Sequence, residues 1–210
     1  MKPTTTVATP SMLDTYGMTY AFTALLLVAG LFTIDRLSIV MYSPVYLALI
    51  AVPFMLGPAI VFAIDSPGSM RIVLRRSAVL APLTVLTGVM LLFLAMIVII
   101  LPLSFWVMPH YSASLTPLFV AALVLVAAPM VVSFVRRIRE GISVSGLIQM
   151  AVLLVVAAMV AWIIVETFAP GDTLYTFLRK DVAKHFTGGF AWYLPALALA
   201  AGLWRRADII

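Results

Sequence analysis

Long apolar stretches alternate with short polar segments along almost the whole chain. A helix that crosses a membrane needs about 20 mostly apolar residues, and six stretches meet or nearly meet that length. They cover approximately residues 18–34, 44–64, 80–103, 117–135, 147–165 and 189–204. The pattern predicts an all-α, polytopic membrane protein, with an N-terminal tail over residues 1–17 and a single six-helix transmembrane domain over residues 18–210.

The positive charges orient these six helices. Residues 65–76 form a polar island between the second and third stretches, and its clustered arginines favour the cytoplasmic side. With this island inside, nine of the 13 lysines and arginines fall inside and four fall outside. The split predicts that both termini are cytoplasmic, in a multi-pass protein of a bacterial-type inner (plasma) membrane.

Composition argues against several kinds of chemistry. Of the 210 residues, 64% are hydrophobic and only 10% are charged, far from the balance of a soluble domain. The chain has no cysteine, which excludes disulfides, thiolate metal sites and a cysteine nucleophile. No predicted span carries an ionisable residue near its centre, which argues against an ion-driven pump and against hydrolysis within the membrane. We therefore expect no enzyme, no catalytic residue, no metal site and no nucleic-acid partner.

Two prolines interrupt the second span. Pro53 and Pro58 each remove a backbone hydrogen bond, and Gly57 lies between them. In lipid the freed carbonyl groups need other partners, so we expect a kinked helix that packs against protein.

A seventh, interfacial helix is predicted between the fifth and sixth spans. Over residues 172–186, apolar side chains recur every three or four residues and form one face, with basic residues elsewhere. Four residues of this outer region are candidates for an outer-mouth or substrate contact: Glu166, His185, Trp192 and Tyr193. Glu166 also fits the simpler role of a boundary carboxylate paired with a cation such as Arg179.

The polar island has two interpretations. In one, its arginines only set the topology and meet anionic lipid headgroups. In the other, it is a short coupling helix that Ser69 caps and that contacts a cytoplasmic partner. The residues of this predicted partner-coupling loop are Asp65, Ser69, Arg71, Arg75 and Arg76.

This layout resembles the permease subunits of ABC-2 type exporters. The resemblance rests on six spans with both termini inside, and on the polar loop at residues 65–76, where such permeases carry a coupling helix. It also rests on the amphipathic connection at residues 166–189, where that family has external half-helices, and on the basic and acidic tail at residues 203–208.

The resemblance implies a function and partners. Two permease subunits would pair, and each would dock a cytoplasmic ATPase through residues 65–76. ATP would be bound by that partner, and this chain would hold no cofactor. The transported molecule would be amphipathic, lipid-like or a peptide.

Two other functions also fit the sequence. The chain fits a non-catalytic structural or accessory subunit of a larger membrane complex, because it shows no strong polar site. It also fits the substrate-binding membrane component of a vitamin importer, in which the four outer residues would line a polar pocket. The proteins and small molecules that copurify with the chain discriminate among the three.

Overall fold

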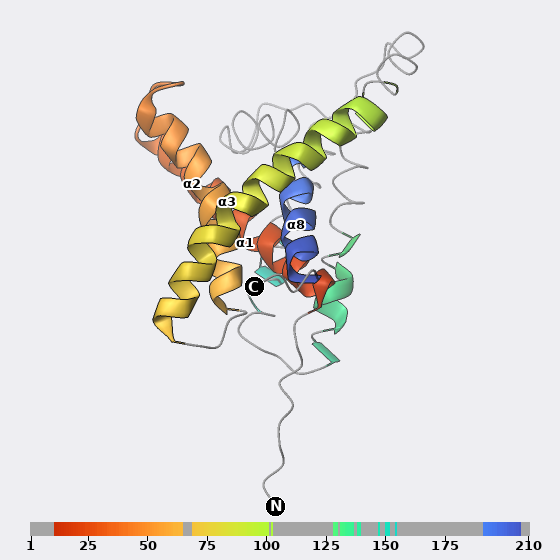
Figure 1. Ribbon diagram of the computed structural model, residues 1–210. Coiled ribbons are helices and arrows are strands. Elements are labelled where there is room, and N and C mark those ends of the chain that lie inside the picture. Colours follow the sequence, from red (N-terminus) through yellow and green to blue (C-terminus); the bar gives the residue numbers. More distant parts are fainter. Residues whose placement is uncertain are drawn as a thin grey trace, which may run out of the picture.

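The chain is all-helical throughout the part that its computed structural model describes. That part comprises residues 11–64, 69–100, 102, 128–129, 131–136, 138–139, 147, 150–151, 154 and 191–206. The helices are α1 (Met12–Arg36), α2 (Pro44–Ile64), α3 (Met70–Ala95) with its π-helical continuation η1 (Met96–Ile100), and α8 (Ala191–Arg206) (Figure 1). Three segments are long and apolar enough to cross a membrane: Met12–Arg36, Pro44–Ile64 and Met70–Val98. This is the architecture of a membrane protein.

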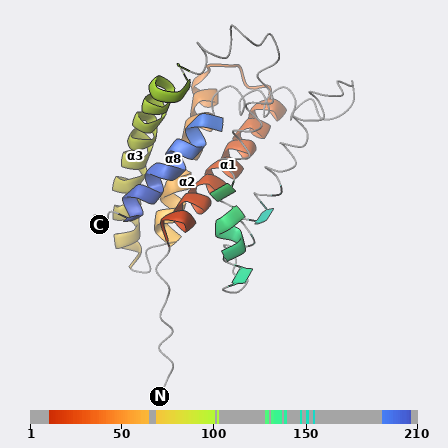
Figure 2. The same cartoon turned by 90° about the vertical axis from the view of Figure 1, so that its right-hand side faces the viewer.

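The four helices pack in a ring. α1 packs against α2 and α8, and α3 also packs against α2 and α8 (Figure 2). Glycines allow close approaches between these helices: Gly30 lies against Leu49 between α1 and α2, and Gly88 lies against Leu197 between α3 and α8. The Ser77 hydroxyl donates a hydrogen bond of 3.2 Å from α3 to the Ala59 carbonyl of α2.

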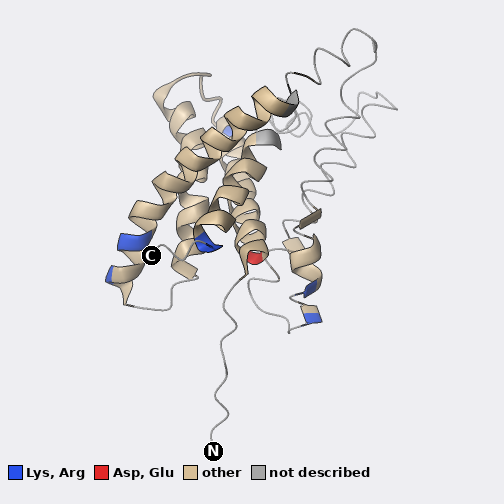
Figure 3. Cartoon of the chain, turned by 45° about the vertical axis from the view of Figure 1, so that its right-hand side comes forward, with Lys and Arg blue, Asp and Glu red and all other residues tan. Residues whose placement is uncertain are grey.

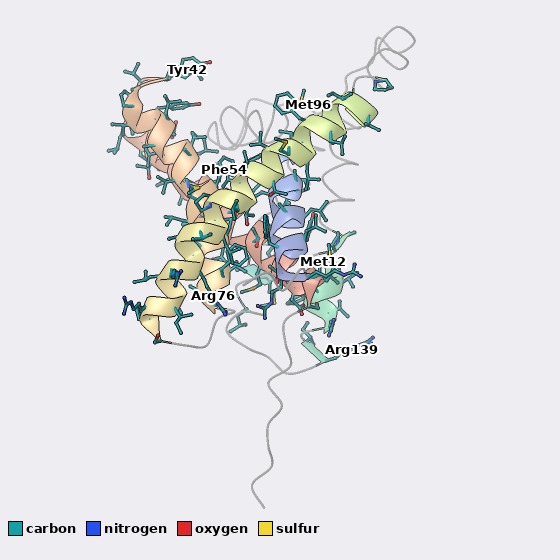
Figure 4. The ribbon with its side chains drawn as sticks, viewed as in Figure 1. Met12, Tyr42, Phe54, Arg76, Met96 and Arg139 are labelled. Carbon is teal, nitrogen blue, oxygen red and sulfur yellow. The ribbon has the colours of Figure 1, made fainter. Side chains whose placement is uncertain are left out.

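One end of this ring is strongly basic. We call it the basic end: α1 and α3 begin there, and α2 and α8 end there. Figure 3 shows blue lysine and arginine ribbon gathered at this end, and Figure 4 labels Met12 and Arg76 towards it, with Tyr42 and Met96 at the opposite end. Of the arginines that the structure describes, Arg36 alone lies at the end of α1 that faces away.

The predicted spans agree with the helices to different degrees. The second span coincides with α2 at both ends. The third overlaps a helix that begins earlier, because α3 starts ten residues before residue 80 and takes in part of the polar island. The sixth corresponds to α8. In the fourth and fifth spans, the described residues (128–129, 131–135, 147, 150–151 and 154) are helical. The remainder of those two spans and the predicted interfacial helix at 172–186 lie outside the described residues.

The first helix begins earlier than the sequence pattern predicts. Residues 12–17, which we assigned to the N-terminal tail, form the first turn and a half of α1. A capping box starts the helix: the Asp14 amide donates to the Ser11 hydroxyl at 3.3 Å, and the Asp14 carboxylate accepts from the Ser11 amide at 3.1 Å. These reciprocal bonds satisfy backbone donors that the start of a helix leaves free. A hydropathy pattern contains no information about capping. This explains why the helix starts six residues before residue 18, the start that the pattern predicts.

Candidate functional site

The inner face of α1 is lined with hydroxyl groups. Thr15, Thr19 and Thr23 recur every four residues, and Tyr16 and Tyr20 repeat the same spacing beside them. Residues four apart lie on the same side of a helix, and all five side chains are buried. The polar side of α1 therefore faces protein, inside a bundle whose outer surface is apolar.

Thr23 meets α2 where that helix carries its glycine. A Cβ atom at Gly57 would overlap the Thr23 hydroxyl oxygen, so only glycine lets the two helices come this close. Pro53 and Pro58 flank the contact, and both are buried within a helix that continues through them. Neither proline has an amide hydrogen, so the carbonyl groups four residues earlier lack their usual helical donor.

The first of these freed carbonyl groups belongs to Leu49, four residues before Pro53. It faces Gly30 of α1: a Cβ atom built on Gly30 would lie only 2.6 Å from the Leu49 oxygen. Glycine at this position lets the α1 backbone approach the carbonyl group, a contact of the kind that Cα–H groups make between closely packed helices. α1 thus meets α2 through glycine twice, and both contacts lie at or near the proline-interrupted segment.

Tyr193, one of the predicted outer-mouth residues, is half-buried and contacts two other helices. Its hydroxyl donates to the Val85 carbonyl of α3 at 3.3 Å. Its ring packs edge-to-face on Phe54 of α2, with 4.7 Å between ring centroids (Phe54 is labelled in Figure 4). Tyr193 therefore joins α8 to both α2 and α3.

The opposite face of α1 carries a buried carboxylate. The Asp14 side chain is 7% exposed. It accepts hydrogen bonds from the Ser11 hydroxyl at 2.8 Å and from the Ser133 hydroxyl at 2.9 Å. Ser133 lies in the helical residues 131–136, so this polar contact ties the start of α1 to a segment 119 positions away. Figure 2 shows that green segment beside α1.

The predicted coupling loop is largely the beginning of α3. Arg71, Arg75 and Arg76 lie in its first two turns; the first two are exposed and Arg76 is half-buried. Ser69 occupies the N-cap position but makes no side-chain capping hydrogen bond. The expectation of a separate short helix is therefore corrected: from Met70 onward, the arginine segment is continuous with the membrane-spanning helix.

The remaining predicted site residues are only partly visible. Asp65, Glu166 and His185 lie outside the described residues, and Trp192 is described only as part of the α8 backbone. Tyr193 is therefore the one outer-mouth candidate whose side chain the structure describes, and it contacts α2 and α3. Within the described part of the chain, no group of three histidine, aspartate or glutamate side chains is placed to hold a metal ion.

Neither Asp14 nor the hydroxyl face stood out in the sequence. Asp14 precedes the first apolar run, and its burial depends on Ser133, far away along the chain. A signal for the hydroxyl face was present in the four-residue spacing of Thr15, Thr19 and Thr23. Average hydropathy conceals such a stripe, because the leucines and alanines around it dominate the mean.

The chain was also compared with known proteins. No family model, no curated protein and no solved structure matches the chain.

Proposed function

We propose that the chain is the transmembrane permease subunit of an ATP-driven exporter of the ABC-2 type, which moves an amphipathic, lipid-like or peptide molecule. In this proposal the chain has six spans, both termini are cytoplasmic, and the basic end faces the cytoplasm. Support for the orientation comes from the described arginines at that end, since basic residues beside spans are retained inside. They are Arg71, Arg75, Arg76, Arg136, Arg139, Arg205 and Arg206.

One observation carries the proposal: the exposed arginines of the island are part of α3. Arg71 and Arg75 project from the first two turns of a helix that continues through Ala95. α3 also packs against α2 and α8. A cytoplasmic protein bound to these arginines would act on a rigid element that reaches across the bundle. Such a connection fits a subunit that passes on the motion of a partner.

The test compares arginines at the same end of the bundle. The double variant Arg71→Ala/Arg75→Ala should lose the copurifying ATPase and the ATP-dependent export. Both side chains are exposed, so folding should be unchanged. Arg206→Ala is the matched control, because Arg206 is also exposed at the basic end but lies on α8. Mild-detergent purification followed by mass spectrometry measures the ATPase. Undiminished ATPase in the double variant would contradict docking through α3.

A second candidate function is a non-catalytic subunit of a larger membrane complex. The outer face of α3 favours it, since Leu86, Met90 and Phe93 are between 57% and 66% exposed along one long helix. Lipid or a neighbouring membrane helix would cover such a face. If the same purification yields stoichiometric membrane subunits and no ATPase, this second function replaces the first.

A further inference from the structure

The connection between α1 and α2 exposes a run of large apolar side chains. We call residues 37–42 the apolar tip, and none of them is charged. Four of its side chains are between 51% and 76% exposed: Leu37, Val40, Met41 and Tyr42. The tip lies at the end of the bundle away from the basic end, where Figure 4 labels Tyr42. A loop that water covers is normally polar, so this one needs another environment.

The first bend of the apolar tip ends α1. The Ile39 amide donates to the Ile34 carbonyl at 3.0 Å. The Ser38 amide donates to the Asp35 carbonyl at 3.2 Å. These two bonds form a Schellman motif, in which one residue takes the left-handed conformation that glycine normally supplies. That residue is Ser38, with a φ of 48°. The end of the helix therefore has backbone groups paired locally, as a segment at the edge of a membrane requires.

The second bend places a large aromatic residue where glycine is usual. The Ser43 amide donates to the Val40 carbonyl at 3.1 Å, so residues 40–43 form a β-turn. Tyr42 is the third residue of this turn and has a φ of 65°, a conformation that is unfavourable for a bulky side chain. Its ring packs edge-to-face on Tyr46, with 6.1 Å between ring centroids, and yet Tyr42 stays 76% exposed. Glycine would form the same turn with less strain, so the tyrosine ring points to a contact outside the chain.

A lipid leaflet is the environment that fits the apolar tip. α1 has 25 residues and is therefore about 38 Å long. The hydrocarbon core of a bilayer is about 30 Å thick, and the bilayer with its headgroups about 40–45 Å, so the tip that follows α1 lies at headgroup level. The helix surfaces beside the tip are also apolar and exposed, with Phe32 at 44% and Val45 at 56%. Arg36 lies over the Phe32 ring, 5.2 Å from its centroid, an arrangement that suits a cation at the lipid boundary.

We propose that the apolar tip inserts into the interface of the lipid leaflet at the end of the bundle away from the basic end, with the Tyr42 ring at headgroup level. Tyrosine is enriched at that level, because its ring is apolar and its hydroxyl is polar. The leaflet covers the exposed apolar side chains of the tip and holds the connection between α1 and α2 in place. The inference goes beyond the exporter function and does not rest on it, since neither an ATPase nor a transported molecule takes part.

Spin labelling tests the depth of the apolar tip, because the chain has no cysteine of its own. Val40→Cys carries a nitroxide in the full chain, reconstituted into vesicles of phosphatidylcholine and phosphatidylglycerol. Collisions of the nitroxide with oxygen, which concentrates in hydrocarbon, are compared with its collisions with a nickel complex that stays in water. Two positions calibrate the oxygen-to-nickel ratio. Met90→Cys is the lipid reference, since Met90 is 66% exposed on α3, and Arg206→Cys is the water reference, since Arg206 is exposed at the end of α8.

The ratio at Val40→Cys should lie between the two references. It should be about threefold or more above that at Arg206→Cys and below that at Met90→Cys, since an interfacial segment is buried only about 5–10 Å deep. A ratio no higher than that at Arg206→Cys would overturn the proposal, because the tip would then lie in water. Few collisions with both reagents would also overturn it, because a second copy of the chain or another protein would then cover the tip.

Glycine substitutions separate anchoring from backbone strain. Tyr42→Gly removes the ring, so the nitroxide at Val40→Cys should move towards water and its oxygen-to-nickel ratio should fall by about half or more. Ser38→Gly is the matched control, because it also relieves a positive φ but removes no aromatic side chain, and it should leave the ratio unchanged. Equal ratios in the two variants would overturn the anchoring role of Tyr42.

Discussion

α1 and α3 are both apolar enough to cross a membrane, yet the bundle buries them to opposite extents. Of the most apolar 18 residues of each helix, 56% are buried in α1 and 17% in α3. The buried helix is the more polar one, with threonines and tyrosines turned inwards. The exposed helix presents leucine, methionine and phenylalanine outwards.

The difference shows what drives packing in this protein. Apolar side chains gain nothing by leaving lipid, which is as apolar as they are. Polar side chains and close backbone contacts therefore decide which helix is central. α1 has both, with a hydroxyl face and the contacts at Gly30 and Gly57. α3 keeps its polar groups at its arginine-rich start and at the α8 contact, where the Trp204 indole donates to the Thr87 hydroxyl at 3.1 Å.

Filling the α1–α2 contact should have the largest effect. Gly57→Leu places a branched side chain where the Thr23 hydroxyl already lies. We expect a loss of about 3 kcal/mol or more in the free energy of unfolding, since neither helix backbone has room to yield. Ala78→Leu adds a similar side chain to the exposed face of α3 and should change stability by less than about 0.5 kcal/mol. SDS titration in mixed micelles, followed by circular dichroism, measures both. Equal stability of the two variants would contradict a central position for α1.

Removing the buried carboxylate should have the next largest effect. Asp14→Ala leaves the Ser133 hydroxyl buried without its acceptor and removes the capping box of α1. Together these losses should lower stability by about 2–3 kcal/mol. Asp35→Ala is the matched control, because Asp35 is exposed at the other end of the same helix, and its effect should stay within about 0.5 kcal/mol. The same SDS titration applies. A costly Asp35→Ala or a harmless Asp14→Ala would show that the carboxylate contact does not hold the start of α1.

The helices were largely predictable from the sequence, for a physical reason. In lipid every backbone polar group must be paired internally, so a long apolar run leaves helix as the available structure. The second span shows this directly, since residues 44–64 coincide with α2. The ends of α1 and α3 were less predictable. Asp14 and Arg71 look like membrane boundaries in a hydropathy pattern, but each lies within a helix that starts earlier.

The candidate site was much less predictable than the fold. Pro53, Pro58 and Gly57 stood out in the sequence, because proline and glycine interrupt a helix locally. Thr23 did not, since its importance depends on the glycine that it meets on another helix. The sequence marked Tyr193 as an outer-mouth candidate, but it gave no sign that its hydroxyl and ring contact two neighbouring helices. The roles of Thr23 and Tyr193 depend on contacts with residues far away in the sequence, and a local sequence pattern does not contain those contacts.

The smallest expected effect has the opposite sign and bears most directly on α1. Thr19→Val and Thr23→Val keep the shape of the side chain and remove a buried hydroxyl that has no partner among the described residues. Each should raise the stability of the bundle by about 1 kcal/mol, because an unpaired polar group is no longer held away from water. Thr33→Val removes a hydroxyl that does donate, to the Ala29 carbonyl, and should give no such gain. If the hydroxyl face serves transport, the two stabilised variants should also export more slowly. Stabilisation with unchanged export would mean that these hydroxyl groups destabilise the fold without serving transport. Destabilisation would mean that the hydroxyl groups have hydrogen-bond partners in the membrane.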